Sequence, residues 1–404
     1  MAAPRLVAID AVRGFAVLGI LTMNIVAMGL PMYAYTDPHH YGGASGADLI
    51  AWGLAYVLAD GKMRALFTML FGASLVLIAE RAEHPAGLHY RRMAALLAIG
   101  MAHAWLLWFG DILVEYAVTG AIAFIGWRWR PAALLFVAAL CFALTLADDL
   151  LAWSQLDAIR AAALAPLASP EAVARWRDVV AATVADPAAL SREIALYRGA
   201  FSDVFAARAP TTWMFQTAVL PLTLPETLGY AAIGMALQRR GFFAGGWPRR
   251  AYAALLAAGA AAILLYVPVA RMLVAARFDP ATVQLANALG FLLRPWLALA
   301  YASGIILLVR AGALPRLVAR LAAAGRMALS NYLGSTLIAT TLFYGYGAGL
   351  YGALSRAQLY WIVAPIWGLM LLWSAPWLRR FAYGPAEWAW RAMSHGEFPR
   401  MRAN

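Results

Sequence analysis

The sequence predicts an all-α integral membrane protein, a helix bundle with about ten to eleven transmembrane helices. Of its 404 residues, 64% are hydrophobic and 13% are charged, a composition far outside the range of water-soluble globular chains. Apolar stretches close to the roughly 20 residues that cross a hydrocarbon core recur along the whole chain, with short polar breaks between them. We therefore expect a single integral membrane domain comprising residues 1–404.

Clusters of arginine separate the apolar stretches into pairs and predict the topology. These clusters lie at residues 81–92, 128–130, 238–250, 310–326 and 378–380. Because the basic loops of multi-pass proteins stay in the cytoplasm, the clusters place both termini on the cytoplasmic side of a bacterial-type inner (plasma) membrane. The same rule predicts ten spans, at about 13–31, 64–80, 93–109, 112–127, 132–151, 212–237, 251–275, 287–309, 327–347 and 360–378.

Several classes of protein are disfavoured by the composition. The net charge of +12 comes in short clusters and not in one basic stripe, so we expect the lipid bilayer and no nucleic acid as a partner. The sole cysteine, Cys141, lies in an apolar run and offers no disulfide framework. Glycine-rich phosphate loops and paired metal-ligating carboxylates are absent from the sequence, so we expect neither ATP-driven transport nor a bound metal. The oligomeric state stays open.

Residues 48–60 do not fit the pattern of full spans. The segment is apolar, but the part between Asp48 and Asp60 is only about 11 residues, or roughly 16 Å as a helix. It is too short to cross a bilayer in a straight line. We expect an interfacial or re-entrant helix on the outer side, or a kinked crossing that adds an eleventh span.

The longest polar interval, 152–210, is predicted to be an external amphipathic helical insertion. Ser169 followed by Pro170 is typical of a capped helix start, and Asp186 followed by Pro187 repeats the pattern. Two amphipathic helices lying on the outer membrane surface account for this composition.

Polar residues within the first span need a reason to be there. Asp10 and Arg13 are three residues apart at its cytoplasmic start, and a local ion pair is one interpretation. Asn24 lies deeper in the span, where an amide faces either a partner helix or a cavity.

The stretch RLVAIDAVRGFAVLGILTMNI, residues 5–25, resembles the amino-terminal signature of the YeiB-like membrane proteins, domain-of-unknown-function family 418. Further blocks of that resemblance lie at 62–75, 91–118, 325–344 and 384–391. The blocks are spread over nearly the whole chain in the order of the family.

The opening pattern, D..RG before the first span, is also similar to that of the transmembrane acyltransferases, which include acyltransferase family three and the lysosomal heparan-glucosaminide N-acetyltransferase. This resemblance implies an acyltransferase-three-like fold that passes an acyl group from cytoplasmic acyl-CoA to an acceptor on the far side. The acceptor would be an envelope glycan, a lipid or a small molecule. Arg13, at the inner mouth, would bind the phosphate-bearing end of coenzyme A.

Acyl transfer needs a general base, for which histidine is the usual residue near neutral pH. His103 lies within the third predicted span, and Asp111 follows eight residues later. If the chain turns at Gly110, the Asp111 carboxylate can orient the imidazole. A purely structural role for His103 is the alternative.

The other histidines are divided between the two sides of the membrane. His39 and His40 lie in the outer loop, where some acyltransferase relatives carry a catalytic histidine, although the family pattern often has an aromatic residue at position 40. His84, His89 and His395 fall in cytoplasmic segments, and we expect them to be solvated.

Four further charges are predicted near the spans. Lys62 and Arg64 begin the second span on the outer side, where they could hold an anionic acceptor or a developing oxyanion, or extend to lipid headgroups. Glu226 and Arg294 are expected to face the bundle interior, because a charge facing lipid is costly.

Two other functions compete with acyl transfer. The same intramembrane polar residues could line the path of a transporter or flippase for a lipid-linked or small polar solute. A non-catalytic envelope scaffold is the third interpretation.

Overall fold

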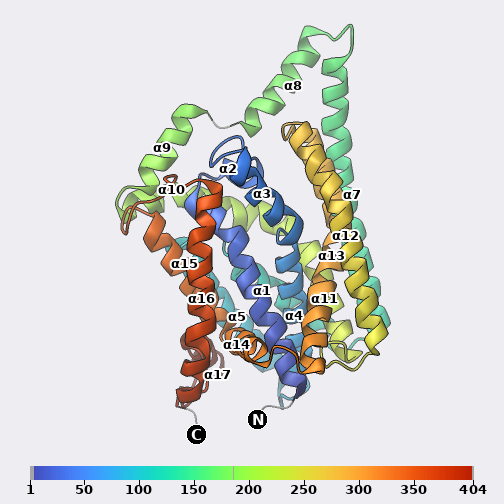
Figure 1. The fold of residues 1–404 in the computed structure, drawn as a ribbon, viewed down its shortest axis with the longest axis vertical. Coiled ribbons are helices and arrows are strands. Elements are labelled where there is room, and N and C mark those ends of the chain that lie inside the picture. Colours follow the sequence, from blue (N-terminus) through green and yellow to red (C-terminus); the bar gives the residue numbers. More distant parts are fainter. Residues whose placement is uncertain (1–3, 185, 403–404) are drawn as a thin grey trace.

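The protein is all-helical along the residues that its computed structural model describes, 4–184 and 186–402, and no strand occurs among them (Figure 1). The helices at the predicted spans are α1 (Pro4–Gly29), α4 (Lys62–Ala79), α5 (Pro85–Leu106), α6 (Leu113–Ala123), α7 (Pro131–Leu164), α10 (Phe201–Met214) continuing through η2 (Phe215–Val219) into α11 (Leu220–Arg239), α12 (Arg249–Ala275), α13 (Pro280–Ala311), α15 (Ala328–Phe343) and α16 (Arg356–Arg380). The others are α2 (Tyr33–Thr36), α3 (Gly46–Leu58), η1 (Phe124–Gly126), α8 (Pro170–Thr183), α9 (Pro187–Tyr197), α14 (Pro315–Arg326) and α17 (Pro385–His395).

Six of the described helical segments are long and apolar enough to cross a membrane, so the chain is a multi-pass membrane protein. They are Val7–Gly29, Gly46–Ala79, Pro131–Leu164, Arg249–Ala275, Pro280–Ala311 and Arg356–Arg380. The other predicted spans also coincide with helices, but these are shorter or more polar. α6 has 11 residues, and α5 carries Arg91, Arg92 and His103. The total of ten crossings therefore stays a prediction.

The short helix predicted at 48–60 is present as α3, and it leads through a tight turn into α4. Gly61 in this turn has a φ of 71°, a left-handed conformation that glycine adopts without steric cost. α3 and α4 together form one 34-residue apolar segment with a bend.

Close packing of α4 against α11 brings charged side chains of the two helices together. A Cβ atom placed on Gly72 would collide with the backbone of Ala231, and one on Gly234 would collide with the backbone of Met69. Glycine at both positions lets the two backbones touch. This contact places Arg64 of α4 beside Glu226 of α11.

The polar interval forms helices at one end of the molecule, opposite the termini (Figure 1). α7 continues to Leu164, so part of the interval prolongs the preceding helix. The predicted starts of α8 and α9 are confirmed, because the Ser169 hydroxyl accepts the Ala172 N–H at 3.2 Å and the Asp186 carboxylate accepts two N–H groups of α9. Membrane-surface binding by these helices stays a prediction.

Arginine-bearing segments that are distant in sequence meet at the end that carries both termini (Figure 1). Arg239 donates to the carbonyl of Trp127, and its guanidinium lies 3.9 Å from the Glu80 carboxylate. Arg310 donates to the carbonyl of Trp247 at 2.6 Å. The grouping agrees with the predicted topology, while the side of the membrane on which this end lies stays a prediction.

Candidate functional site

A cavity of about 470 Å³ lies in the middle of the bundle, and we call it the central cavity. Its charged and amide-bearing lining residues are Asn24, Asp60, Arg64, Asp111, Glu115, Gln216 and Arg294. Asn24 makes no side-chain hydrogen bond to any residue that the structure describes, so its amide is available to the cavity. Asp60, Glu115 and Gln216 had no predicted role in the site, because only the packing of their helices shows that they share one space.

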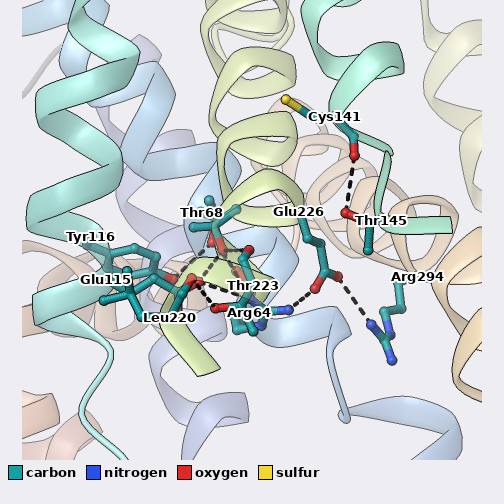
Figure 2. Close-up of polar contacts among 11 residues, drawn as sticks. Arg64, Thr68, Glu115, Tyr116, Cys141, Thr145, Leu220, Thr223, Glu226 and Arg294 are labelled. Atoms are coloured by element: carbon teal, nitrogen blue, oxygen red, sulfur yellow. Dashed lines mark hydrogen bonds and ion pairs between the residues drawn. The ribbon is translucent and has the colours of Figure 1, made fainter. Parts of the chain in front are cut away.

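Arg64, Glu226 and Arg294 form a partly buried network of ion pairs beside the central cavity, with Glu226 as its buried member (Figure 2). One Glu226 oxygen accepts from the Arg64 guanidinium, and the other lies 3.2 Å from Nη1 of Arg294. Arg64 also lies 3.6 Å from Oε1 of Glu115, and the Thr227 hydroxyl contacts both of these residues. Two guanidinium groups and two carboxylates therefore compensate one another, as buried charges in a membrane bundle require. Glu226 does not line the cavity, but it pairs with Arg64 and Arg294, which do.

Lys62 differs from the prediction that placed it beside Arg64 as a substrate contact. Its side chain is buried and does not line the central cavity. The ammonium donates to the carbonyl of Tyr56 and lies 3.6 Å from the centre of the Tyr266 ring. These contacts also rule out extension of the side chain to lipid headgroups. Position 62 follows the Gly61 turn, which directs this residue toward α12 and away from the cavity.

The contact expected between His103 and Asp111 is present. Nδ1 of His103 lies 2.6 Å from Oδ2 of Asp111, and Oδ1 of Asp111 accepts the N–H of Val114 at 2.8 Å. Both side chains are nearly inaccessible, with 1% and 2% of their surfaces exposed. With an ionised carboxylate at Nδ1, that nitrogen carries the proton and Nε2 keeps its lone pair.

Two residues that the sequence did not reveal hold the turn carrying Asp111. Gly100 of α5 faces this turn, and a Cβ atom there would lie 2.8 Å from the nitrogen of Val114 and 3.1 Å from Oδ1 of Asp111. Arg208 of α10 is fully buried and donates to the carbonyls of Leu107 and Trp105, at 2.7 and 2.6 Å. It satisfies carbonyl groups that the end of α5 leaves unpaired.

A second cavity, of about 270 Å³, lies toward the end with the termini, and we call it the basic cavity. Its arginine, glutamate and histidine lining residues are Arg13, His89, Arg92, Arg326, Glu387 and Arg391. Arg13 forms the local ion pair expected with Asp10, at 2.8 Å, and also donates to the Ser74 hydroxyl at 2.8 Å. The Arg13 side chain therefore makes local structural contacts and also lines the basic cavity.

Ile20, Ile112 and Tyr116 line both the central and the basic cavity, and we call these three residues the septum. The His103 ring does not line either cavity; it lies 5.1 Å from the ring of Tyr332, which lines the basic cavity. Nε2 of His103 is buried and has no partner among the residues that the structure describes. The pair of His103 and Asp111 thus lies between the two cavities, with Asp111 on the central side.

His89 contradicts the expectation that it is solvated. It is 5% exposed, donates from Nε2 to the carbonyl of Gly120 at 2.9 Å and stacks on Phe124. Burial lowers the pKa of this residue, which precedes the predicted third span, and the neighbouring Arg92 lowers it further. His84 and His395 are exposed, as expected. Helices α6 and η1 cover His89, and the local sequence contains no sign of that contact.

A third cavity, of about 1050 Å³, lies beneath α8 and α9, and we call it the vestibule. It shares Met32, Thr36 and Phe109 with the central cavity. His40 lines the vestibule with Nε2 3.4 Å from Asp37, whereas His39 is exposed with Nδ1 2.8 Å from the same carboxylate. The two outer-loop histidines therefore lie apart from the central cavity.

Comparison with known proteins identifies a family of bacterial relatives. Residues 237–397 match the family model described as "Protein of unknown function (DUF418)". The chain is 32% identical over 397 residues to the uncharacterized protein YeiB of Escherichia coli (strain K12), which covers 96% of each chain. It is 27% identical over 406 residues to the uncharacterized protein YxaH of Bacillus subtilis (strain 168), covering 97% of this chain and 94% of YxaH. No solved structure matches the chain significantly. The chain belongs to the YeiB-like DUF418 family of membrane proteins.

Proposed function

We propose that the protein is a membrane-embedded acyltransferase that moves an acyl group from acyl-CoA to an acceptor in the cell envelope. The observation that supports this proposal is the position of the His103–Asp111 pair between a basic cavity and a polar central cavity. A base is needed where donor and acceptor meet, and the septum is where the two cavities adjoin. The termini, with the basic cavity, would face the cytoplasm of the inner membrane.

The reaction uses this arrangement as follows. The acceptor hydroxyl or amine, held in the central cavity, attacks the thioester carbonyl, and a carbon–oxygen or carbon–nitrogen bond replaces the carbon–sulfur bond. In this scheme Nε2 of His103 takes the acceptor proton and returns it to the departing thiolate, while Asp111 stabilises the imidazolium formed in between. Because the His103 ring lines neither cavity, this step requires a rearrangement at the septum that admits the acceptor to Nε2. In the neutral tautomer with its proton on Nδ1, His103 supplies the Nε2 lone pair that this step requires, and Nε2 makes no hydrogen bond to a described residue.

The two arginines of the central cavity pair with Glu226, and in this scheme they also stabilise negative charge on the substrate. Arg64 and Arg294 line it, and an oxyanion or an anionic acceptor near them would gain electrostatic stabilisation. Asn24 offers an uncharged donor and acceptor for orienting the substrate.

Thioester consumption by the purified full chain tests the proposal. Acetyl-CoA and an extract of envelope lipids and glycans are supplied to protein in nanodiscs, and free thiol is measured. We expect release that depends on the extract and is abolished by His103→Ala, while His84→Ala, at an exposed position, retains it. Equal release by wild type and His103→Ala would contradict the assignment of the base, and no release with any extract would contradict the function.

A transporter is the second candidate, because the vestibule, central cavity and basic cavity adjoin in series through shared lining residues. Such a series also describes a permeation path. Flux of labelled small polar solutes into proteoliposomes, with no thioester consumption, would favour transport over acyl transfer.

A further inference from the structure

The basic cavity concentrates guanidinium groups from four helices that are distant in sequence. Arg13 comes from α1, Arg92 from α5, Arg326 from α14 and Arg391 from α17. Arginine carries its charge at every physiological pH, so these groups repel one another unless negative charge lies between them.

Arg92 is the most informative member of this set. It is 8% exposed, and its guanidinium lies 4.1 Å from the centre of the Trp390 ring. Neither an acid within 4.0 Å nor a hydrogen-bond acceptor contacts the Arg92 guanidinium among the residues that the structure describes. Arg391 lies over the ring of Tyr383 and also has no acidic partner in the described part of the chain. A buried charge without a counter-charge is costly, and a bound anion would remove that cost.

Asp10 and Glu387, two acidic residues near the basic cavity, already have partners within the protein. Asp10 is paired with Arg13. Glu387 accepts the N–H groups of Leu329 and Ser330, at 2.7 and 3.1 Å, and the Ser330 hydroxyl. Its carboxylate thus caps the start of α15, and it forms no ion pair with a cavity arginine among the residues that the structure describes. The lining therefore keeps an excess of positive charge.

We infer that the basic cavity binds a ligand through a phosphate or pyrophosphate group, held by Arg92, Arg326 and Arg391 together with Arg13. Planar guanidinium groups match phosphate oxygens in two-point hydrogen bonds, which makes arginine the residue suited to this ligand. Assignment of the phosphate to the acyl donor rests on the proposed function, whereas the anion site itself does not.

The rest of the lining indicates what accompanies the phosphate. Phe67, Phe71, Leu75, Met93 and Leu96 supply an apolar wall that leads toward the septum. A ligand with a charged head and a less polar arm fits this division. Two sources have that chemistry: a soluble phosphorylated thioester donor and an anionic lipid.

Binding to the full chain in neutral detergent distinguishes these sources. Adenosine 3′,5′-bisphosphate and inorganic pyrophosphate are the soluble probes, measured by calorimetry at low and high salt. Nanodiscs made with neutral lipid alone, or with added phosphatidylglycerol, report whether an anionic lipid competes for the site. Arg92→Gln and Arg391→Gln remove one charge each, and Arg92→Lys keeps the charge at this buried position. Arg91→Gln, next to Arg92 but exposed and outside the lining, is the matched control.

We expect both soluble probes to bind, more weakly at high salt, and each Gln variant to weaken binding about tenfold or more. Arg91→Gln should bind like wild type, and Arg92→Lys should fall between. Loss of soluble-probe binding in phosphatidylglycerol nanodiscs would identify a lipid as the occupant of the same site. Equal affinities for wild type and both Gln variants, or no binding of either probe in neutral detergent, would overturn the inference. His103→Ala should bind both soluble probes normally. Probe binding by the wild-type protein without any thioester consumption would contradict the proposed function and leave this site in place.

Discussion

Nδ1 of His103 lies 2.6 Å from Oδ2 of Asp111, and the other oxygen of the same carboxylate is fixed by the Val114 N–H. The carboxylate is therefore locked in two directions, and it sets the tautomer of the imidazole. Asp111→Asn preserves the shape of the side chain but removes the charge that stabilises an imidazolium. We expect kcat for thioester transfer to fall by about a hundredfold or more, with KM changing much less. Steady-state kinetics with varied acceptor measure both constants. A change confined to KM would indicate that Asp111 binds the acceptor and does not orient the base.

Glu226 forms ion pairs with the guanidinium groups of Arg64 and Arg294, and without it these two positive charges would lose a shared counter-charge. Glu226→Gln should lower the free energy of unfolding by about 3 kcal/mol or more, because removing one partner of a buried ion pair leaves uncompensated charge. Thermal unfolding in detergent measures the loss. Glu171→Gln, at an exposed position of α8, is the control and should have little effect. The double variant with Arg294→Gln should recover part of the stability, and an additive loss would show that the two side chains act independently.

His89 should make stability depend on pH. Burial lowers its folded-state pKa below the ordinary value of about 6.5, so the unfolded chain binds the proton at a higher pH than the folded protein does. Stability is then greatest above the unfolded pKa and is lost as the pH falls through it toward the lowered folded pKa. The difference in Tm between about pH 7.5 and 5.5 should shrink in His89→Gln, which keeps a donor for Gly120. His84→Gln should retain the wild-type difference, and an unchanged difference in His89→Gln would exclude this residue as its cause.

Reporter fusions test which side of the membrane each end faces. Fusions after Arg130, Arg240 and Arg320 should be cytoplasmic, and one within 152–210 should be external, as the arginine distribution requires. Enzymatic reporters active on only one side of the membrane give the answer. An external signal after Arg240 would invalidate the span assignment from α11 onward.

The local sequence predicted helices and their starts well, but it predicted the surroundings of single side chains less well. Ser169 with Pro170 determines a helix start by contacts within four residues, so no distant partner is needed to foresee it. The Asp111 contact was also foreseeable, because a bend at Gly110 returns the chain to α5. Lys62 and His89 were misplaced, since helices remote in sequence bury them. Arg92 and Arg391 meet only because α5 and α17 pack together, and no spacing along the chain encodes that meeting.

The segment η2 is a π-helix, a wider turn that accommodates an extra residue within a continuous helix. It separates Arg208, which fixes the turn carrying Asp111, from Glu226, which organises the cavity arginines. If residues 215–219 adopted regular α-helical geometry with no residue removed, everything beyond them would rotate by roughly 100° about the helix axis, the angle of one α-helical residue. Glu226 would then point away from Arg64 while Arg208 kept its place. One extra residue in this turn therefore sets the angular phase between the two halves of the site.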